Sequence, residues 1–360
     1  MVLDFAKEAV GNAESHSINF DELKAGKANI KVIGCGGCGC NAITWLYNKG
    51  INGATVYGMN TDALHLSVTK ADEKVLIGKE LTRGLGCGGK PSRGREAAKE
   101  ALVDVKKAVA NADMVFIVAG MGGGTGTGAA PVAAQIAKEA GAVVIAVVTM
   151  PFESEKARID KAEFGLAELR EVSDTCIVLD NNRLVDIAGQ LPIEQAFAVA
   201  NELVSTMIKG IVETITLPSL INLDYADVST IMKDGGVAVI GIGESDSQSS
   251  RVEESVKQAL THPLLDVDYQ GATGALIHVT CGPDLKLEEF DTIGKSVSEN
   301  LSPEAQVIIG ARISKDFVGK VRVITIMTGV KSPYVLGKHL EQGSTHQARE
   351  VSDLGIEVWR

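Results

Sequence analysis

The chain has 360 residues, of which 45% are hydrophobic and 4% aromatic, enough for a sizeable core and typical of an α/β protein. Its 35 basic and 46 acidic residues give a net charge of −11, which argues against binding to nucleic acid or directly to anionic lipid. No apolar stretch approaches the length of a membrane span, and residues 1–10 carry charges where a signal peptide needs an apolar core, so we expect a cytoplasmic protein without membrane insertion.

After a polar extension at 1–28, residues 29–187 alternate short apolar runs with helical patterns. This alternation predicts a doubly wound parallel sheet, in which the loops gather at the carboxyl ends of the strands. The predicted strands cover 30–34, 54–58, 113–119, 142–149 and 175–179. The predicted helices cover 42–49, 92–110, 128–140 and 158–171.

The first predicted strand runs into a glycine-rich loop, Gly34 to Asn41, which precedes a helix. Gly34, Gly36 and Gly39 satisfy the dinucleotide pattern G-x-G-x-x-G, and Asp62 follows near the end of the next strand. A nicotinamide-binding oxidoreductase is therefore one open interpretation.

A second and longer glycine-rich run, Ala119 to Ala130, follows a later apolar strand and precedes another helix. Its glycines let a bulky anion touch backbone N–H groups directly, with the positive end of the helix behind them and threonine hydroxyls as extra donors. A Rossmann unit needs one such loop, and the P-loop pattern G-x-x-x-x-G-K-[ST] is absent from the sequence. Two loops that converge on one polyphosphate favour a mononucleotide triphosphate.

The first loop also contains the pattern C-x-x-C-x-C, formed by Cys35, Cys38 and Cys40, and Cys87 lies in another glycine-rich segment. A zinc or iron–sulfur site is one interpretation. We favour the other, in which cysteine supplies a small side chain beside the backbone, because metal ligation here would block the phosphate site.

The central segment, 188–216, is predicted to be a long helix that begins at Pro192 and ends before Pro218, with apolar residues at helical spacing. The helix should be mostly buried and about 24 residues, or roughly 35 Å, long. Its apolar stripe comprises Ile193, Phe197, Ala200, Val204, Met207, Ile211 and Ile215.

The remainder, 217–330, predicts a second α+β domain, and 331–360 is a polar, charged tail. Strands are expected at 237–243, 274–281, 306–313 and 320–328. Helices are expected at 225–233, 251–261 and 286–299. The tail ends in the apolar cluster LGIEVWR, which either docks a partner protein or packs on the body of the chain.

An acidic motif, Asn222-Leu223-Asp224-Tyr225-Ala226-Asp227, follows the long helix. From the pattern alone, Asp224 is a helix N-cap and Asp227 a first-turn acid that the helix dipole favours.

The run GMGGGTGTGAAP at 120–131 resembles the signature of the tubulin/FtsZ family of GTPases, and the resemblance extends from about residue 30 to 329. Further family motifs follow in family order: GCGGCGCN (34–41), NTDA (60–63), TRGLGCGG (82–89), TMPF (149–152), NNRL (181–184) and NLDYAD (222–227). The end of the tail is similar to archaeal members. The resemblance implies a GTP-dependent, filament-forming protein of cell division, which uses GTP/GDP and Mg²⁺, polymerises head to tail and meets a membrane-anchoring or regulatory protein through its tail.

The resemblance also assigns roles to residues. It implies phosphate binding by Gly36, Gly37, Cys38, Gly39, Cys40 and Asn41, and by Gly122, Gly123, Gly124, Thr125, Gly126, Thr127 and Gly128. It implies that Asn60, Asp62, Gly86, Gly88 and Gly89 border the γ-phosphate and Mg²⁺, the metal being held through phosphates and water. Ribose and base contacts are implied for Arg158 with Glu153 or Glu155, and for Asn181, Phe197 and Asn201.

In the family pattern, Asp224 and Asp227, oriented by Asn222, polarise the water that attacks the γ-phosphate. With Phe197 at one nucleotide, Asp224 should lie roughly 30 Å further along the helix axis. The acids should therefore serve the nucleotide of another copy, and a heterologous contact that does not close generates a filament. A nicotinamide oxidoreductase and a nucleotide-binding regulator without hydrolysis remain the alternatives.

Overall fold

The structure is a computed structural model that describes residues 28–330 except 218, 222, 234, 262–268 and 300. The predictions for the N-terminal extension before residue 28 and for the tail at 331–360 lie outside the described residues. Within the described ranges, none of the helices combines the length and the apolar composition that a membrane crossing requires.

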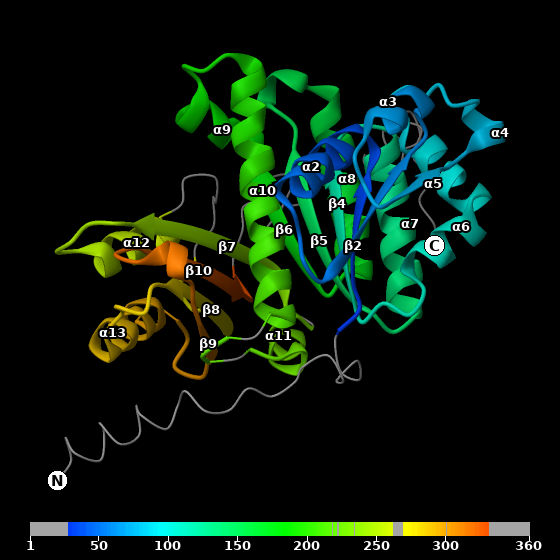
Figure 1. Cartoon of the computed structure of the whole chain (residues 1–360). Coiled ribbons are helices and arrows are strands. Elements are labelled where there is room, and N and C mark those ends of the chain that lie inside the picture. The colour runs from blue at the N-terminus through cyan, green and yellow to red at the C-terminus, as the bar shows by residue number, and fades with distance from the viewer. Residues whose placement is uncertain are drawn as a thin grey trace, which may run out of the picture.

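In the part of the chain that the structure describes, ten strands form one continuous sheet in the order β3-β2-β1-β4-β5-β6-β7-β10-β8-β9 (Figure 1). The strands β1 to β6 pair in parallel, which confirms the parallel sheet predicted for five of them and adds β3 at its edge. Their bounds are β1 (Ile30–Cys35), β2 (Ala54–Asn60), β3 (Glu73–Leu76), β4 (Met114–Gly120), β5 (Val143–Met150) and β6 (Thr175–Asp180). Because the strand order reverses between β1 and β4, the loops that follow these strands diverge to opposite faces and leave a crevice for a ligand.

Helices cover both faces of this parallel sheet. Apolar side chains alternate along the strands: Val32 faces the core shared with α2 and α10, whereas Ile33 faces the core shared with α5 to α8. The bounds are α2 (Gly36–Lys49), α3 (Ala63–Val68), α4 (Lys79–Thr82), α5 (Pro91–Glu100), α6 (Leu102–Val109), α7 (Thr125–Glu139), α8 (Ala157–Val172), α9 (Asn181–Ala188) and α10 (Ile193–Thr216). The helix predicted at 92–110 is divided into α5 and α6 at Ala101, whose backbone leaves the helical region.

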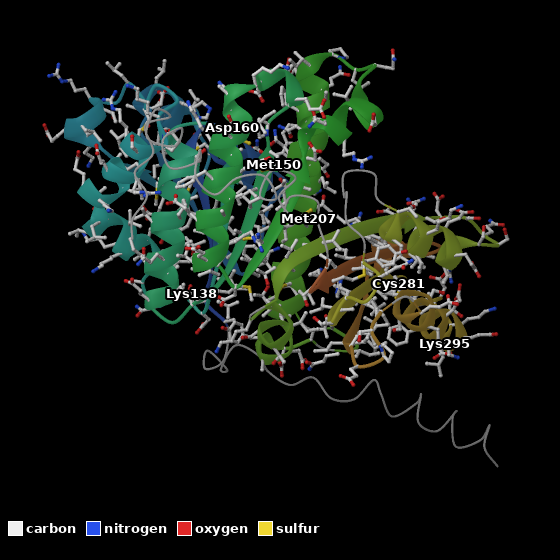
Figure 2. The ribbon with its side chains drawn as sticks, turned by 180° about the vertical axis from the view of Figure 1, so that it is seen from behind. Lys138, Met150, Asp160, Met207, Cys281 and Lys295 are labelled. Atoms are coloured by element: carbon white, nitrogen blue, oxygen red, sulfur yellow. The ribbon has the colours of Figure 1, made fainter. Side chains whose placement is uncertain are left out.

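Helix α7 runs antiparallel to the strands. Its last turn carries Lys138, which Figure 2 shows near the lower end of the sheet and which pairs at 3.4 Å with Asp174, just before β6. The N-terminus of α7 therefore lies at the opposite edge, where the parallel strands end.

The predicted long helix is α10, and its 24 residues confirm the expected length. The expectation that it is mostly buried is wrong for its first turns, where Ile193 is 75% and Phe197 40% exposed. Burial begins at Leu203, because the first turns lie beside α9 while the later turns pack against the sheet (Figure 1).

The strands after α10 continue the same sheet, because β7 pairs in parallel with β6. Antiparallel pairing joins β7, β10 and β8, so the sheet is mixed beyond this point. The bounds are β7 (Gly236–Ser245), β8 (Gly274–Cys281), β9 (Gln306–Ile313) and β10 (Val321–Thr328), with helices α11 (Tyr225–Met232), α12 (Arg251–Leu260) and α13 (Leu287–Ser298). These elements confirm the predicted α+β character.

Candidate nucleotide-binding site

The two glycine-rich segments lie side by side, because β1 and β4 are neighbours with Cys35 opposite Ala119. A Cβ added to Gly36 would lie 2.8 Å from the backbone nitrogen of Gly126, so the two segments touch through their backbones. Helices α2 and α7 both begin at this edge. Their positive ends and unpaired backbone N–H groups make the edge a site for an anion.

One set of glycines is required by packing. A Cβ on Gly39 would collide with the carbonyl oxygen of Val118, and one on Gly126 would lie 2.7 Å from the carbonyl oxygen of Gly120. Gly128 packs in the same way against Pro91. Gly39 therefore lets α2 approach β4 closely, and Gly126 and Gly128 let α7 approach β4 and α5.

A second set of glycines borders open space. No atom lies within 4 Å of a Cβ built on Gly37, Gly86, Gly88, Gly89 or Gly123. These glycines come from three segments that are far apart in sequence: that of Gly37, that of Gly86 to Gly89, and that of Gly123. In each segment, neighbouring glycines are closely packed or have a positive φ. Bare backbone that faces solvent at two helix N-termini is what a polyphosphate needs for direct N–H contacts.

Hydrogen bonds join two of these segments, those of Cys87 and Thr125, to Thr61, a residue that motif reading did not single out as a ligand contact. The Thr61 hydroxyl lies 2.7 Å from the Thr125 hydroxyl, and the Cys87 thiol donates to Thr61 at 3.4 Å. Asp62 is the N-cap of α3 and accepts from the backbone N–H of His65 at 2.9 Å. The position of Thr61 inside the NTDA motif, between Asn60 and Asp62, is the feature of the sequence that could have indicated its place in the site.

The structure does not bring the Thr127 hydroxyl to the open edge. Thr127 is buried, its hydroxyl oxygen has no hydrogen-bond partner among the described residues, and its methyl group packs where Gly165 of α8 leaves room. Thr125, two residues earlier, is the threonine that reaches the other loops.

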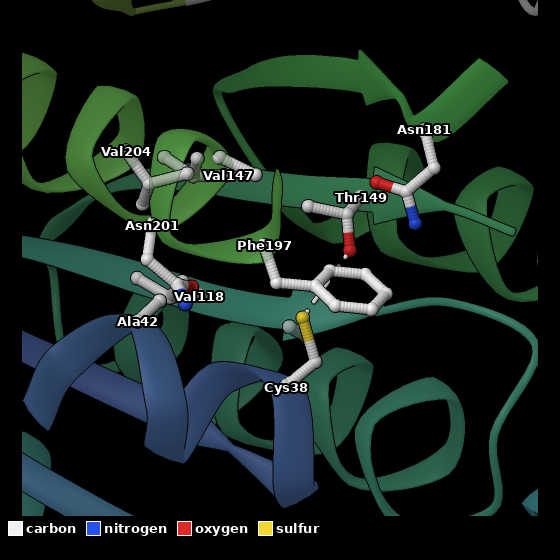
Figure 3. A pocket seen from close by; sticks show the side chains of 11 residues that line it. Cys38, Ala42, Val118, Val147, Thr149, Asn181, Phe197, Asn201 and Val204 are labelled. Atoms are coloured by element: carbon white, nitrogen blue, oxygen red, sulfur yellow. Dashed lines mark hydrogen bonds between the residues drawn. The ribbon is translucent and has the colours of Figure 1, made fainter. Parts of the chain in front are cut away.

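An apolar pocket adjoins the phosphate edge (Figure 3). The amides of Asn181 and Asn201 stand among apolar side chains, so its lining suits a flat, partly polar ring. The Phe197 ring lies beside Cys38 and Thr149 in Figure 3, and the Cys38 sulfur lies 3.4 Å from the Thr149 hydroxyl. The lining residues are Cys38, Ala42, Val118, Ala119, Val147, Thr149, Asn181, Phe197, Ala200, Asn201 and Val204.

Neighbouring side chains hold this pocket in shape. Phe152, which sequence reasoning did not assign to the site, makes an edge-to-face contact with Phe197 at 6.1 Å between ring centroids. Arg158 pairs with Glu155 at 2.5 Å, and Glu155 also accepts from the backbone N–H of Phe152 at 3.0 Å. Of the two candidate glutamates, Glu155 is therefore the one that contacts Arg158 in this structure.

Polar contacts also join α10 to the C-terminal half of α2. Trp45 donates to Glu202 at 2.7 Å, and Lys49 forms an ion pair with the same carboxylate. Burial raises the pKa of Glu202, but the hydrogen bonds from Lys49 and Trp45 outweigh it, and the net pKa is lowered. Glu202 directly follows Asn201 of the pocket.

The cysteines of the first loop are free thiols in the structure. Burial raises the pKa of Cys40 to about 11 and raises that of Cys35 further, so both remain neutral. Among the described residues, no group of three or more His, Cys, Asp or Glu side chains is arranged to hold a metal ion.

The acidic motif lies at the other edge of the sheet. Asp224 caps α11 and accepts from the Asp227 N–H at 2.8 Å, while Asp227 accepts from the Asp224 N–H at 3.2 Å. The next residue, Tyr225, donates through its hydroxyl to the carbonyl oxygen of Asp113, just before β4. The glycine-rich signature follows the opposite end of β4, which is seven residues and therefore about 20 Å long.

The structure therefore does not bring Asp224 and Asp227 to the glycine-rich edge of their own molecule. Asn222, the remaining member of the motif, lies outside the described residues.

Comparison with known proteins identifies the class to which this fold and site belong. Residues 29–189 match the model of the GTPase domain of the tubulin/FtsZ family, and residues 236–331 match the C-terminal domain of the FtsZ family. The chain belongs to the FtsZ branch of the tubulin/FtsZ family of GTPases, the cell division GTPases, and neither alternative class is supported.

Two curated relatives and one solved structure illustrate the similarity. Cell division protein FtsZ 2 of Methanocaldococcus jannaschii is 52% identical over 340 residues, covering 94% of this chain and 89% of the relative. Cell division protein FtsZ 2 of Halobacterium salinarum is 50% identical over 357 residues, covering 98% and 90%. The structure of an empty FtsZ dimer from M. jannaschii is 49% identical with a TM-score of 0.79, covering 90% of this chain and 92% of that one.

Proposed function

We propose that GTP binds across the carboxyl edge of β1 and β4. The phosphates would lie on the open glycines, with donors from the starts of α2 and α7 and from the Thr125 hydroxyl. The guanine would occupy the apolar pocket against Phe197, with Asn181 and Asn201 bonding to its polar edge, and the Arg158–Glu155 pair would border the ribose. The open glycines and the adjoining pocket support this arrangement, because together they offer bare N–H groups for phosphates beside an apolar slot for a base.

Hydrolysis is proposed to require a second copy of the chain. The observation that carries this proposal is the hydrogen bond from Tyr225 to Asp113, which holds the acids at the amino edge of the sheet while the phosphate loops lie at the carboxyl edge. Asp224 and Asp227 of one copy would orient and polarise water at the γ-phosphate of the next. Since the two surfaces differ, the contact repeats head to tail and yields a filament.

Mg²⁺ is proposed to bind through phosphate oxygens and water rather than through a cluster of protein ligands. It would offset the charge of the phosphates, while the chain's own residues orient the nucleotide and the water. Catalysis then depends on positioning and charge neutralisation, and no covalent intermediate is involved.

We further propose that the filament acts at the division site and that the tail at 331–360 docks a membrane-anchoring or regulatory protein. A peptide of residues 351–360 should compete with the full chain for that protein, whereas a peptide with Ile356 and Val358 replaced by Ser should not compete.

The trans mechanism is tested by the GTPase rate as a function of protein concentration, with light scattering recorded in parallel. The rate per molecule should rise cooperatively where scattering appears. Mixing provides a sharper test: Asp224→Ala supplies an intact pocket without the acid, and Gly123→Ala supplies the acid without an intact phosphate site. Each variant alone should be inactive and the mixture partly active, whereas a rate per molecule that stays constant on dilution would contradict the proposal.

A further inference from the structure

His65, on the first turn of α3, lies between two residues of the proposed phosphate site. Its Nε2 atom lies 3.0 Å from Oδ1 of Asn41, at the start of α2, and its Nδ1 atom lies 3.2 Å from Nδ2 of Asn60, at the end of β2. The imidazole is half-buried and its backbone N–H is held by the Asp62 carboxylate. The proposed function gives His65 no role.

The direction of these hydrogen bonds follows from the backbone. Oδ1 of Asn60 accepts from the backbone N–H of Thr61 at 2.9 Å and from that of Asp62 at 3.3 Å. Because both of these groups are obligatory donors, this atom is the oxygen, and the amide NH₂ of Asn60 faces His65. Nδ1 of His65 must then accept a hydrogen bond, and the imidazole proton resides on Nε2.

The position of this proton also fixes the orientation of the Asn41 amide. The Nε2–H group donates to Oδ1 of Asn41, so the side-chain oxygen of Asn41 is turned toward His65. Its NH₂ group is directed the other way, and Asn41 is exposed at the edge where α2 begins. The NH₂ group of Asn41 is therefore turned away from His65, whereas that of Asn60 is turned toward it.

We propose that His65 is a positioning residue that orients Asn41 to donate to a phosphate oxygen of the nucleotide, an inference that rests on the proposed GTP site. Without the imidazole, the Asn41 amide is free to rotate by half a turn and present its oxygen, which repels an anion. The relay also joins the segment after β1 to the segment after β2, so both are in place before the nucleotide binds.

The test compares His65→Leu, His65→Gln and the control Ser67→Ala, all in the full chain. Leu fills similar space without polar atoms, whereas the Gln amide offers both a donor for Asn41 and an acceptor for Asn60. Ser67 lies on the same helix, and among the described residues its hydroxyl bonds only to the Leu64 carbonyl within α3. GDP affinity is measured by calorimetry, since GDP avoids turnover, and melting temperatures are recorded without nucleotide.

His65→Leu should bind GDP roughly tenfold more weakly, the effect expected for one charge-assisted hydrogen bond. His65→Gln should recover most of this loss, Ser67→Ala should bind like wild type, and the melting temperatures should agree closely. The inference is overturned if His65→Leu binds like wild type, or if His65→Gln binds as weakly as His65→Leu. Failure of the wild-type chain to bind GDP would instead overturn the proposed GTP site.

Discussion

Replacing Asp224 by Asn and by Ala separates its structural role from its proposed catalytic role. As the N-cap of α11, its side-chain oxygen accepts the Asp227 N–H at 2.8 Å. Asn caps helices as well as Asp, whereas Ala costs about 1 kcal/mol at such a position. The helix itself should persist in both variants, because it buries Val228, Ile231 and Met232 in the core.

The two variants should therefore agree in turnover and differ in stability. Loss of a group that activates water should lower the GTPase rate by roughly 10²–10⁴-fold in both, measured by phosphate release at a concentration where filaments form. Urea unfolding should show about 1 kcal/mol lost in Asp224→Ala and almost none in Asp224→Asn. If Asp224→Asn hydrolyses GTP at the wild-type rate, the carboxylate is a cap and nothing more, and the catalytic assignment is wrong.

Other predictions concern the glycines, the pocket and a buried histidine. Gly123→Ala should leave the melting temperature of the free protein unchanged but prevent tight nucleotide binding, whereas Gly39→Ala should destabilise the fold by about 1–3 kcal/mol in urea unfolding, because its methyl group would collide with the Val118 carbonyl. Phe197→Ala should weaken GTP binding by calorimetry while changing stability little, because the ring is 40% exposed. Burial lowers the pKa of His278 to about 4, and neither ring nitrogen has a hydrogen-bond partner among the described residues. Because the folded state resists protonation, its stability should fall as pH drops from about 6.5 to 4, by about 3 kcal/mol more than in His278→Leu; parallel curves would refute this.

The bounds of the strands that precede the glycine-rich loops were predicted to within two residues. Buried parallel strands are recognisable in the sequence because they are continuous apolar runs bounded by glycine. The edge strand β3 was missed: Glu73 and Lys74 are exposed, so it lacks that signal. The start of α2 was placed too late, since glycines are poor helix formers. Its first turn is stabilised by tertiary contact, where Gly36 meets Gly126 and Gly39 meets the chain beside Val118.

The residues that meet across the site were only partly accessible to motif reading. Asn60 and Asp62 belong to a recognisable motif, but the proposed role of His65 depends on its contact with Asn41, which is 24 positions away in the chain. The sequence alone does not show that these two residues meet. They meet because β2 pairs with β1 in the sheet, which brings the segments that follow the two strands together. The burial of the first turns of α10 was overestimated for a similar reason, because an apolar stripe does not reveal where the supporting sheet ends.

The sequence by itself determined the class of this protein, since the spacing of its glycines, apolar runs and acidic residues is a local property that needs no folded partner. Only the tertiary structure decided which glycines pack and which face open space, which way the Asn41 amide points, and that the acids lie at the edge opposite the phosphate loops. Those properties arise from contacts between distant segments, and the distances between such segments are set by packing rather than by position along the chain.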